Sequence, residues 1–267
     1  MSEEKTIHFV SGLPRSGSTL LCNILAQNPR FHVTATSGIL EVMYQVRNRW
    51  DHIVEFKAAP DDVAKLRVLR SILFSYHDNG DRPVIFDKSR GWLAYLEMAE
   101  AVLGRKAKVL VPVRDIRDVL ASFEKLFRKN AAVFQPAQEA DQRTYFDWQT
   151  LEGRCKIWGD KSQPVGLAYN RIKDALQRKF GDRMHFVRYE ELTTKPQEVM
   201  EGIYGFLGEE TFDHDFNYVD QVTYEDDFVH GFRDLHKIRP KVEPQRPQWP
   251  EILGKKIADL FEGTELW

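Results

Sequence analysis

The feature that most constrains this chain is a glycine- and serine-rich loop near its start, with the sequence Gly12-Leu13-Pro14-Arg15-Ser16-Gly17-Ser18-Thr19. It follows a short β-rich run at residues 6–11 and opens a stretch with helical apolar spacing at residues 18–27. A strand, a tight loop and a helix in that order gather unpaired N–H groups and a positive helix end around one point. We therefore expect the loop to bind an anion through backbone amides and through the hydroxyls of Ser16, Ser18 and Thr19.

The rest of the chain alternates between two kinds of pattern. Further β-rich runs occur at residues 83–87, 108–113 and 184–189, and helical spacing occurs at 94–103, 115–128, 165–180 and 196–207. Strands that alternate with such helices predict right-handed crossovers, and hence an α/β fold with a central parallel sheet flanked by helices, of P-loop nucleotide-binding type. No Pro/Gly/Ser linker divides residues 1–267, so we expect a single domain.

Two stretches are less regular than the rest. Residues 130–147 are polar and lack a period, which indicates a flexible cap or an inserted loop. Residues 224–250 are rich in Pro, His and basic residues, and we expect them to form an extended tail that covers a ligand.

Charge and cysteine content exclude several function classes. The chain has 38 Lys plus Arg against 40 Asp plus Glu, so its overall charge gives no support to nucleic-acid binding. Any anionic ligand must therefore be bound by a local cluster of cationic residues. Cys22 and Cys155 are interpreted as reduced thiols, which fits a reducing compartment. The start of the chain lacks a signal-peptide pattern, and no apolar run approaches the roughly 20 residues of a membrane span. We expect a cytoplasmic protein without membrane insertion.

The loop differs from the ATPase version at one informative position. That version reads G-x-x-x-x-G-K-[ST], whereas this chain has Ser18 in place of the lysine and carries its cation at Arg15. The residue that would contact the β- and γ-phosphates of ATP is therefore missing. A P-loop kinase or other NTPase remains the alternative, and a turn of this composition can also bind nothing.

With these residues, GLPRSGSTLL resembles the 5′-phosphosulfate loop of sulfotransferases that use 3′-phosphoadenosine 5′-phosphosulfate (PAPS). Its form is most similar to the branch that includes protein-tyrosine sulfotransferases and many bacterial sulfotransferases. The resemblance implies a second motif, an Arg at a strand end and a Ser eight residues later, which together hold the 3′-phosphate. Arg114 and Ser122 have this spacing. A salt bridge from Arg114 to Asp115 or Asp118 is the structural alternative.

Two further segments resemble parts of this family. Tyr189, in the segment RYEEL, is expected either to contact the adenine or to pack in the core. The basic segment LHKIRPK at 235–241 resembles the part with which relatives cover the nucleotide, although a solvated turn explains it as well. The resemblance implies no metal and a set of residues that bind PAPS and its product adenosine 3′,5′-bisphosphate (PAP): Pro14, Arg15, Ser16, Gly17, Ser18, Thr19, Arg114, Ser122, Tyr189 and Lys237.

Arg15 and Lys88 are the candidate catalytic residues for in-line sulfuryl transfer from PAPS to a hydroxyl or amine acceptor. Arg15 lies inside the loop, where it can bridge the leaving phosphate and the sulfuryl oxygens. Lys88 follows the run 83–87, after which the resemblance places a catalytic Lys or His. A cation there stabilises the charge that develops on the sulfuryl group or on the bridging oxygen. The alternative is a surface lysine paired with Asp87.

The sequence does not identify which residue serves as the general base. The Glu that tyrosine-sulfating relatives carry after the first helix has no counterpart in residues 33–38, VTATSG. Glu41, Asp87 and His32 are candidates, or the acceptor needs little activation. A third possibility is a nucleotide-binding protein that has lost catalysis. The acceptor, whether small molecule or protein, and the oligomeric state leave no signal in the sequence.

Overall fold

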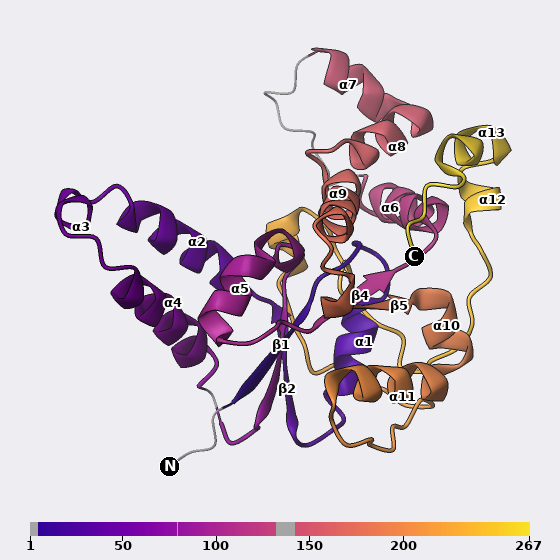
Figure 1. The fold of residues 1–267 in the computed structure, drawn as a ribbon. Helices are drawn as coiled ribbons and strands as arrows, with labels where there is room; N and C mark the ends of the chain where they lie inside the picture. Colours follow the sequence, from indigo (N-terminus) through magenta and orange to yellow (C-terminus); the bar gives the residue numbers. More distant parts are fainter. Residues whose placement is uncertain (1–4, 79, 132–141) are drawn as a thin grey trace.

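The computed structural model describes residues 5–78, 80–131 and 142–267. Its centre is a sheet of five strands in the order β2-β3-β1-β4-β5, and every neighbouring pair is parallel (Figure 1). The α/β fold with a central parallel sheet is thus confirmed. The strands are β1 (Thr6–Val10), β2 (Phe31–Thr36), β3 (Val84–Lys88), β4 (Val109–Val113) and β5 (Met184–Arg188).

The inner strands are apolar because helices cover both faces of the sheet. Every residue of β3 and β4 is buried. One core joins the sheet to α5 (Leu96–Leu103), α6 (Ile116–Asn130) and α9 (Pro164–Gln177). The other core joins it to α1 (Ser18–Leu25) and α11 (Pro196–Leu207). These are the five helices that the sequence predicted, each displaced by a few residues at most.

The remaining elements surround this layered centre. An arm of α2, α3 and α4 projects to one side of the sheet in Figure 1, while α12 packs beside α6 and α13 follows next to α12. Among the described residues, no helix has the length and apolar character required to span a membrane. The α-helices not yet named are α2 (Ile39–Trp50), α3 (Val54–Ala58), α4 (Asp62–Tyr76), α7 (Gln142–Gln149), α8 (Leu151–Gly159), α10 (Tyr189–Thr194), α12 (Trp249–Ile252) and α13 (Lys255–Ala258).

Several details differ from the sequence predictions. β2 was not predicted, although its sequence FHVTAT alternates apolar and polar residues as a half-buried edge strand does. Tyr189 opens α10 instead of ending the strand before it. Of the predicted cap or loop at 130–147, residues 132–141 lie outside the described residues and α7 begins at position 142. The tail at 224–250 is mostly irregular, as expected, with the short turn η3 (Asp227–His230) near its start.

Candidate functional site

The loop after β1 is fastened to β4. The Leu13 N–H donates to the Pro112 carbonyl at 2.9 Å, and a Cβ at Gly12 would lie 2.2 Å from the same oxygen, so only glycine fits. The Ser16 hydroxyl donates to the carbonyls of Leu13 (2.6 Å) and Pro112 (3.0 Å). This corrects one expectation, because the Ser16 hydroxyl is buried and holds the loop in place instead of facing an anion.

The loop has a backbone conformation that curls it around a point. Arg15 (φ 58°) and Gly17 (φ 82°) are both left-handed. A non-glycine residue in that region costs on the order of 1–3 kcal/mol and occurs preferentially at functional sites. A Cβ at Gly17 would come within 2.5 Å of the Tyr189 ring, so the glycine also permits the loop to lie against α10. Such curled loops direct successive N–H groups toward an anion.

The loop borders a cavity of about 660 Å³ at the carboxyl edge of the sheet. This is the edge at which parallel α/β sheets bind ligands. All the site residues that the sequence predicted, except Ser16, line this cavity: Pro14, Arg15, Gly17, Ser18, Thr19, Lys88, Arg114, Ser122, Tyr189 and Lys237. The structure therefore brings together segments that are up to about 220 positions apart in the chain.

The cavity wall is strongly basic although the chain as a whole is nearly neutral. Among the residues that the structure describes, two acidic ones line it, Asp234 and Glu243, and Asp234 already pairs with Lys129 at 2.5 Å. Such a concentration of cations favours a ligand with more than one anionic group. Nine cationic residues line it: Arg15, Lys88, Arg90, Arg114, Lys125, Lys129, Lys237, Arg239 and Lys241.

Arg114 follows the end of β4 and is incompletely satisfied. Its guanidinium stacks 4.5 Å over the Tyr189 ring, and one of its nitrogens lies 3.5 Å from Asp118, the partner foreseen in the structural alternative. Its Nε is nevertheless buried without a hydrogen-bond partner among the described residues. A buried donor of this kind is costly unless a ligand or water satisfies it.

Arg15 connects the loop with Ser122 on α6. Its Nε donates to the Ser122 hydroxyl at 3.1 Å, and another of its nitrogens donates to the carbonyl of Leu235 in the tail. Burial lowers the pKa of Arg15, and the nearby charge of Arg114 lowers it further. Two guanidinium groups that destabilise each other's charge are stabilised by an anion placed between them.

Lys88, the last residue of β3, has an ion-pair partner that the sequence did not reveal. Its Nζ lies 2.9 Å from Glu225 Oε1, and both side chains are about 90% buried. The same carboxylate accepts hydrogen bonds from the N–H (2.8 Å) and hydroxyl (2.7 Å) of Thr36, at the end of β2. Burial alone would raise the pKa of Glu225, but Lys88 and Thr36 outweigh it and hold that pKa at about 2.

The three residues proposed above as general base do not line the cavity. Asp87, expected as the partner of Lys88, is fully buried and accepts a hydrogen bond from the Trp92 indole at 2.6 Å. Glu41 is exposed on α2 and accepts a hydrogen bond from Gln45. His32 lies within β2, where burial lowers its pKa.

Known proteins that resemble this chain include sulfotransferases. A family model described as "Sulfotransferase family" matches residues 8–214. The sulfotransferase domain from the Synechococcus PCC 7002 olefin synthase is 19% identical, with a TM-score of 0.51 over 98% of this chain and 96% of that one. The sulfotransferase domain from the curacin biosynthetic pathway has the same identity and TM-score, over 98% and 92% of the two chains.

A mouse sulfotransferase, SULT7A1 complexed with PAP, is 16% identical, with a TM-score of 0.47 over 80% of this chain and 61% of that one. A search among the curated proteins finds no match. At these identities the likeness to the two sulfotransferase domains establishes that this chain shares their fold.

Proposed function

Because the chain belongs to the sulfotransferase family and is an enzyme of sulfuryl transfer, we propose that its donor is PAPS and that its acceptor is a hydroxyl or an amine. The observation that carries the choice of donor is Arg114, which lines the cavity and whose Nε is buried without a hydrogen-bond partner among the described residues; we assign it to a second anionic group. A nucleotide with one phosphorylated end needs one anion site, whereas PAPS has a 5′-phosphosulfate and a 3′-phosphate.

The residues present fit both ends of PAPS. The loop and the first turn of α1 offer backbone N–H groups and the hydroxyls of Ser18 and Thr19 to the 5′-phosphosulfate. The buried, unpartnered Nε of Arg114 and the Ser122 hydroxyl meet the 3′-phosphate. Tyr189 supports Arg114 by stacking beneath it, and this position also borders the space for the adenine.

Two cations act on the reacting end of the donor. PAPS supplies an activated sulfuryl group whose departure leaves negative charge on the 5′-phosphate. Arg15 stabilises this phosphate from within the loop, and Lys88 stabilises the sulfuryl oxygens and the bridging oxygen from the end of β3. Lys88 keeps its ion pair with Glu225 while it does so, because an ammonium has three N–H donors.

The compartment is a second part of this proposal. Cys22 and Cys155 are both free and buried, and burial raises the pKa of their thiols to about 11 and about 12. Thiols that stay protonated and inaccessible support a protein of the cytoplasm, where reducing conditions prevail.

The test is incubation of the protein with PAPS and a panel of acceptors, followed by mass spectrometry for an added sulfuryl group. The panel pairs carboxylate-bearing acceptors with their neutral amides, because Arg90 lines the cavity and its side chain makes no hydrogen bond or ion pair with the described residues. A parallel incubation replaces PAPS with Mg-ATP. Transfer from ATP, or failure of PAP to bind in calorimetry, would contradict the proposal.

A further inference from the structure

The tail carries a carboxylate–imidazole pair at the cavity. His236 Nδ1 lies 2.6 Å from Asp227 Oδ1, and the His236 backbone N–H donates to Asp227 Oδ2 at 3.1 Å. Asp227 therefore holds both the ring and the backbone of His236. Both side chains are largely buried, with exposed fractions of 20% for His236 and 14% for Asp227. The ring is fixed in orientation, which a solvated histidine is not.

This contact determines which nitrogen of the neutral ring carries the proton. A carboxylate accepts hydrogen bonds, so Nδ1 is the protonated nitrogen and Nε2 keeps its lone pair. Nε2 has no hydrogen-bond partner among residues 5–78, 80–131 and 142–267. His236 lines the same cavity as Arg15 and Lys88, the two cations at the reacting end of the donor.

The groups around the ring act on the pKa of His236 in opposite directions. Burial lowers the pKa of His236, and Lys88 adds to this effect, while Asp227 and Glu225 oppose it. The ring is therefore neutral when the acceptor arrives. Once protonated, it lies between the Asp227 carboxylate and Glu225 Oε2, which is 3.6 Å from Nδ1. The charged or titratable groups that face the ring from the elements packed around it are Asp227, Glu225, His230 and Lys88.

We propose that His236, oriented by Asp227, is the general base that accepts the proton of the acceptor hydroxyl or amine. The inference rests on the proposed function. As the acceptor oxygen or nitrogen bonds to sulfur, its proton moves to Nε2 of His236. The bond between sulfur and the 5′-phosphate oxygen breaks, and its electron pair stays on that oxygen, beside Arg15 and Lys88. PAP leaves, and His236 returns its proton to solvent.

Glu225 is the competing candidate in the same cluster, and its surroundings argue against it. Its carboxylate is already bonded by the Lys88 ammonium and by the N–H and hydroxyl of Thr36, and its pKa is about 2. A carboxylate with so low a pKa is a weak base. Glu225 instead positions Lys88 and stabilises the protonated form of His236.

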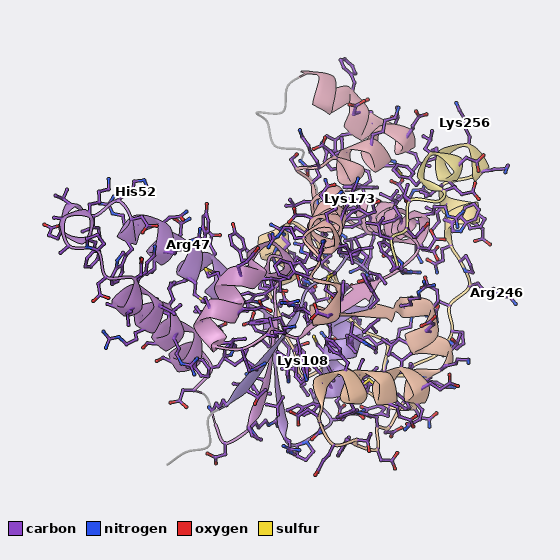
Figure 2. The ribbon with its side chains drawn as sticks, in the orientation of Figure 1. Arg47, His52, Lys108, Lys173, Arg246 and Lys256 are labelled. Atoms are coloured by element: carbon purple, nitrogen blue, oxygen red, sulfur yellow. The ribbon has the colours of Figure 1, made fainter. Side chains whose placement is uncertain are left out.

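Kinetics of three variants test the assignment with the best acceptor of the panel. Removal of a general base costs about 10²- to 10⁴-fold. His236→Gln is expected to lower kcat at least about 100-fold, to remove the acidic limb of the pH–rate profile, and to leave the Kd for PAP within about threefold. Asp227→Asn is expected to lower kcat about tenfold or more. His52→Gln is the control, because His52 lies on the arm, away from the cavity (Figure 2), and it is expected to match the wild type.

A second measurement needs no acceptor. In the PAP-bound wild type, long-range proton–nitrogen NMR is expected to show His236 protonated on Nδ1 and unprotonated on Nε2 at pH 7. In Asp227→Asn this preference for Nδ1 is expected to be lost, a change that a merely structural carboxylate would not cause. A proton on Nε2 at pH 7 in the wild type would overturn the proposal.

The kinetic outcomes also separate this inference from the function on which it rests. If wild-type protein binds PAP and transfers the sulfuryl group, but His236→Gln keeps its rate and its acidic limb, the base assignment is wrong and the function stands. If Glu225→Gln loses that limb while His236→Gln keeps it, Glu225 is the base and the proposal is overturned. If wild-type protein does not bind PAP, the proposed function itself fails.

Discussion

Arg114 provides the sharpest test of the donor, because its expected effect depends on a single phosphate of the ligand. Arg114→Ala removes the guanidinium assigned to the 3′-phosphate of PAP and leaves the phosphate loop unchanged. Its removal leaves the buried Asp118 with two other hydrogen bonds, from the N–H groups of Gln248 (2.7 Å) and Trp249 (3.1 Å). We therefore expect the variant to fold.

The magnitude follows from the contacts of Arg114. A hydrogen bond to a charged group contributes about 1.5–3 kcal/mol, and here it also satisfies an Nε that is buried without a partner in the described part of the chain. Loss of the repulsion between Arg114 and Arg15 removes a further reason for an anion to bind. The expected loss in affinity for PAP is thus roughly 10- to 150-fold. Adenosine 5′-phosphate lacks the 3′-phosphate, so its Kd is expected to change less than about threefold.

Isothermal titration of both nucleotides against wild type and variant measures this difference directly. Arg47→Ala is the matched control, because it removes an arginine from the arm at a distance from the cavity (Figure 2). Equal losses for the two nucleotides would show that Arg114 acts on the protein's overall charge or fold, and the assignment of the 3′-phosphate site would be refuted.

Three further predictions concern the reacting end of the site. Lys88→Met is expected to lower kcat about 100-fold or more with little change in the Kd for PAPS. Arg15→Met is expected to lower both affinity and turnover, and the control Lys256→Met, on α13, is expected to change neither. A normal kcat in Lys88→Met would show that Lys88 has no catalytic role. Activity is expected to survive EDTA, and a loss that magnesium restores would favour a phosphotransferase. Glu225 has its pKa lowered from 4.5 to about 2, so its stabilising effect is present above pH 4.5 and is lost as the pH falls toward 2. The unfolding temperatures of wild type and Glu225→Gln should converge over that range, and a constant gap would contradict the ion pair with Lys88.

The parts of the site that the sequence predicted are those whose function depends on local order. Gly12–Thr19 and Arg114–Ser122 each combine a strand end with a helix start, and the resemblance to the sulfotransferase family indicated which residues of the second segment to expect at the site. The register of the sheet then brings them together, because β1 pairs with both β3 and β4. Lys88 was predicted for the same reason, since it is opposite Val10, two residues before the loop begins.

The parts that were not predicted depend on contacts without a local pattern. Glu225 reaches Lys88 across 137 positions, and it belongs to an irregular segment with neither helical nor alternating apolar spacing. Asp87 was expected beside Lys88 as a chain neighbour, but adjacent residues of a strand point to opposite faces. Its carboxylate consequently meets Trp92 in the core, while Lys88 faces the cavity.

The tail contacts also change how the donor's affinity should be understood. Lys88 is paired with Glu225 and Arg15 donates to the Leu235 carbonyl, so the two cations that we propose act on the donor also hold the tail in place. Both cations have further N–H donors, so an anion at the reacting end can add contacts to them, although their charge is already partly satisfied by the tail. Arg114, whose Nε is unpartnered within the described residues, has no such contact at that atom. We therefore expect the 3′-phosphate of the proposed donor to contribute more to ground-state binding, and the cations at the sulfuryl end to act mainly as charge develops during transfer.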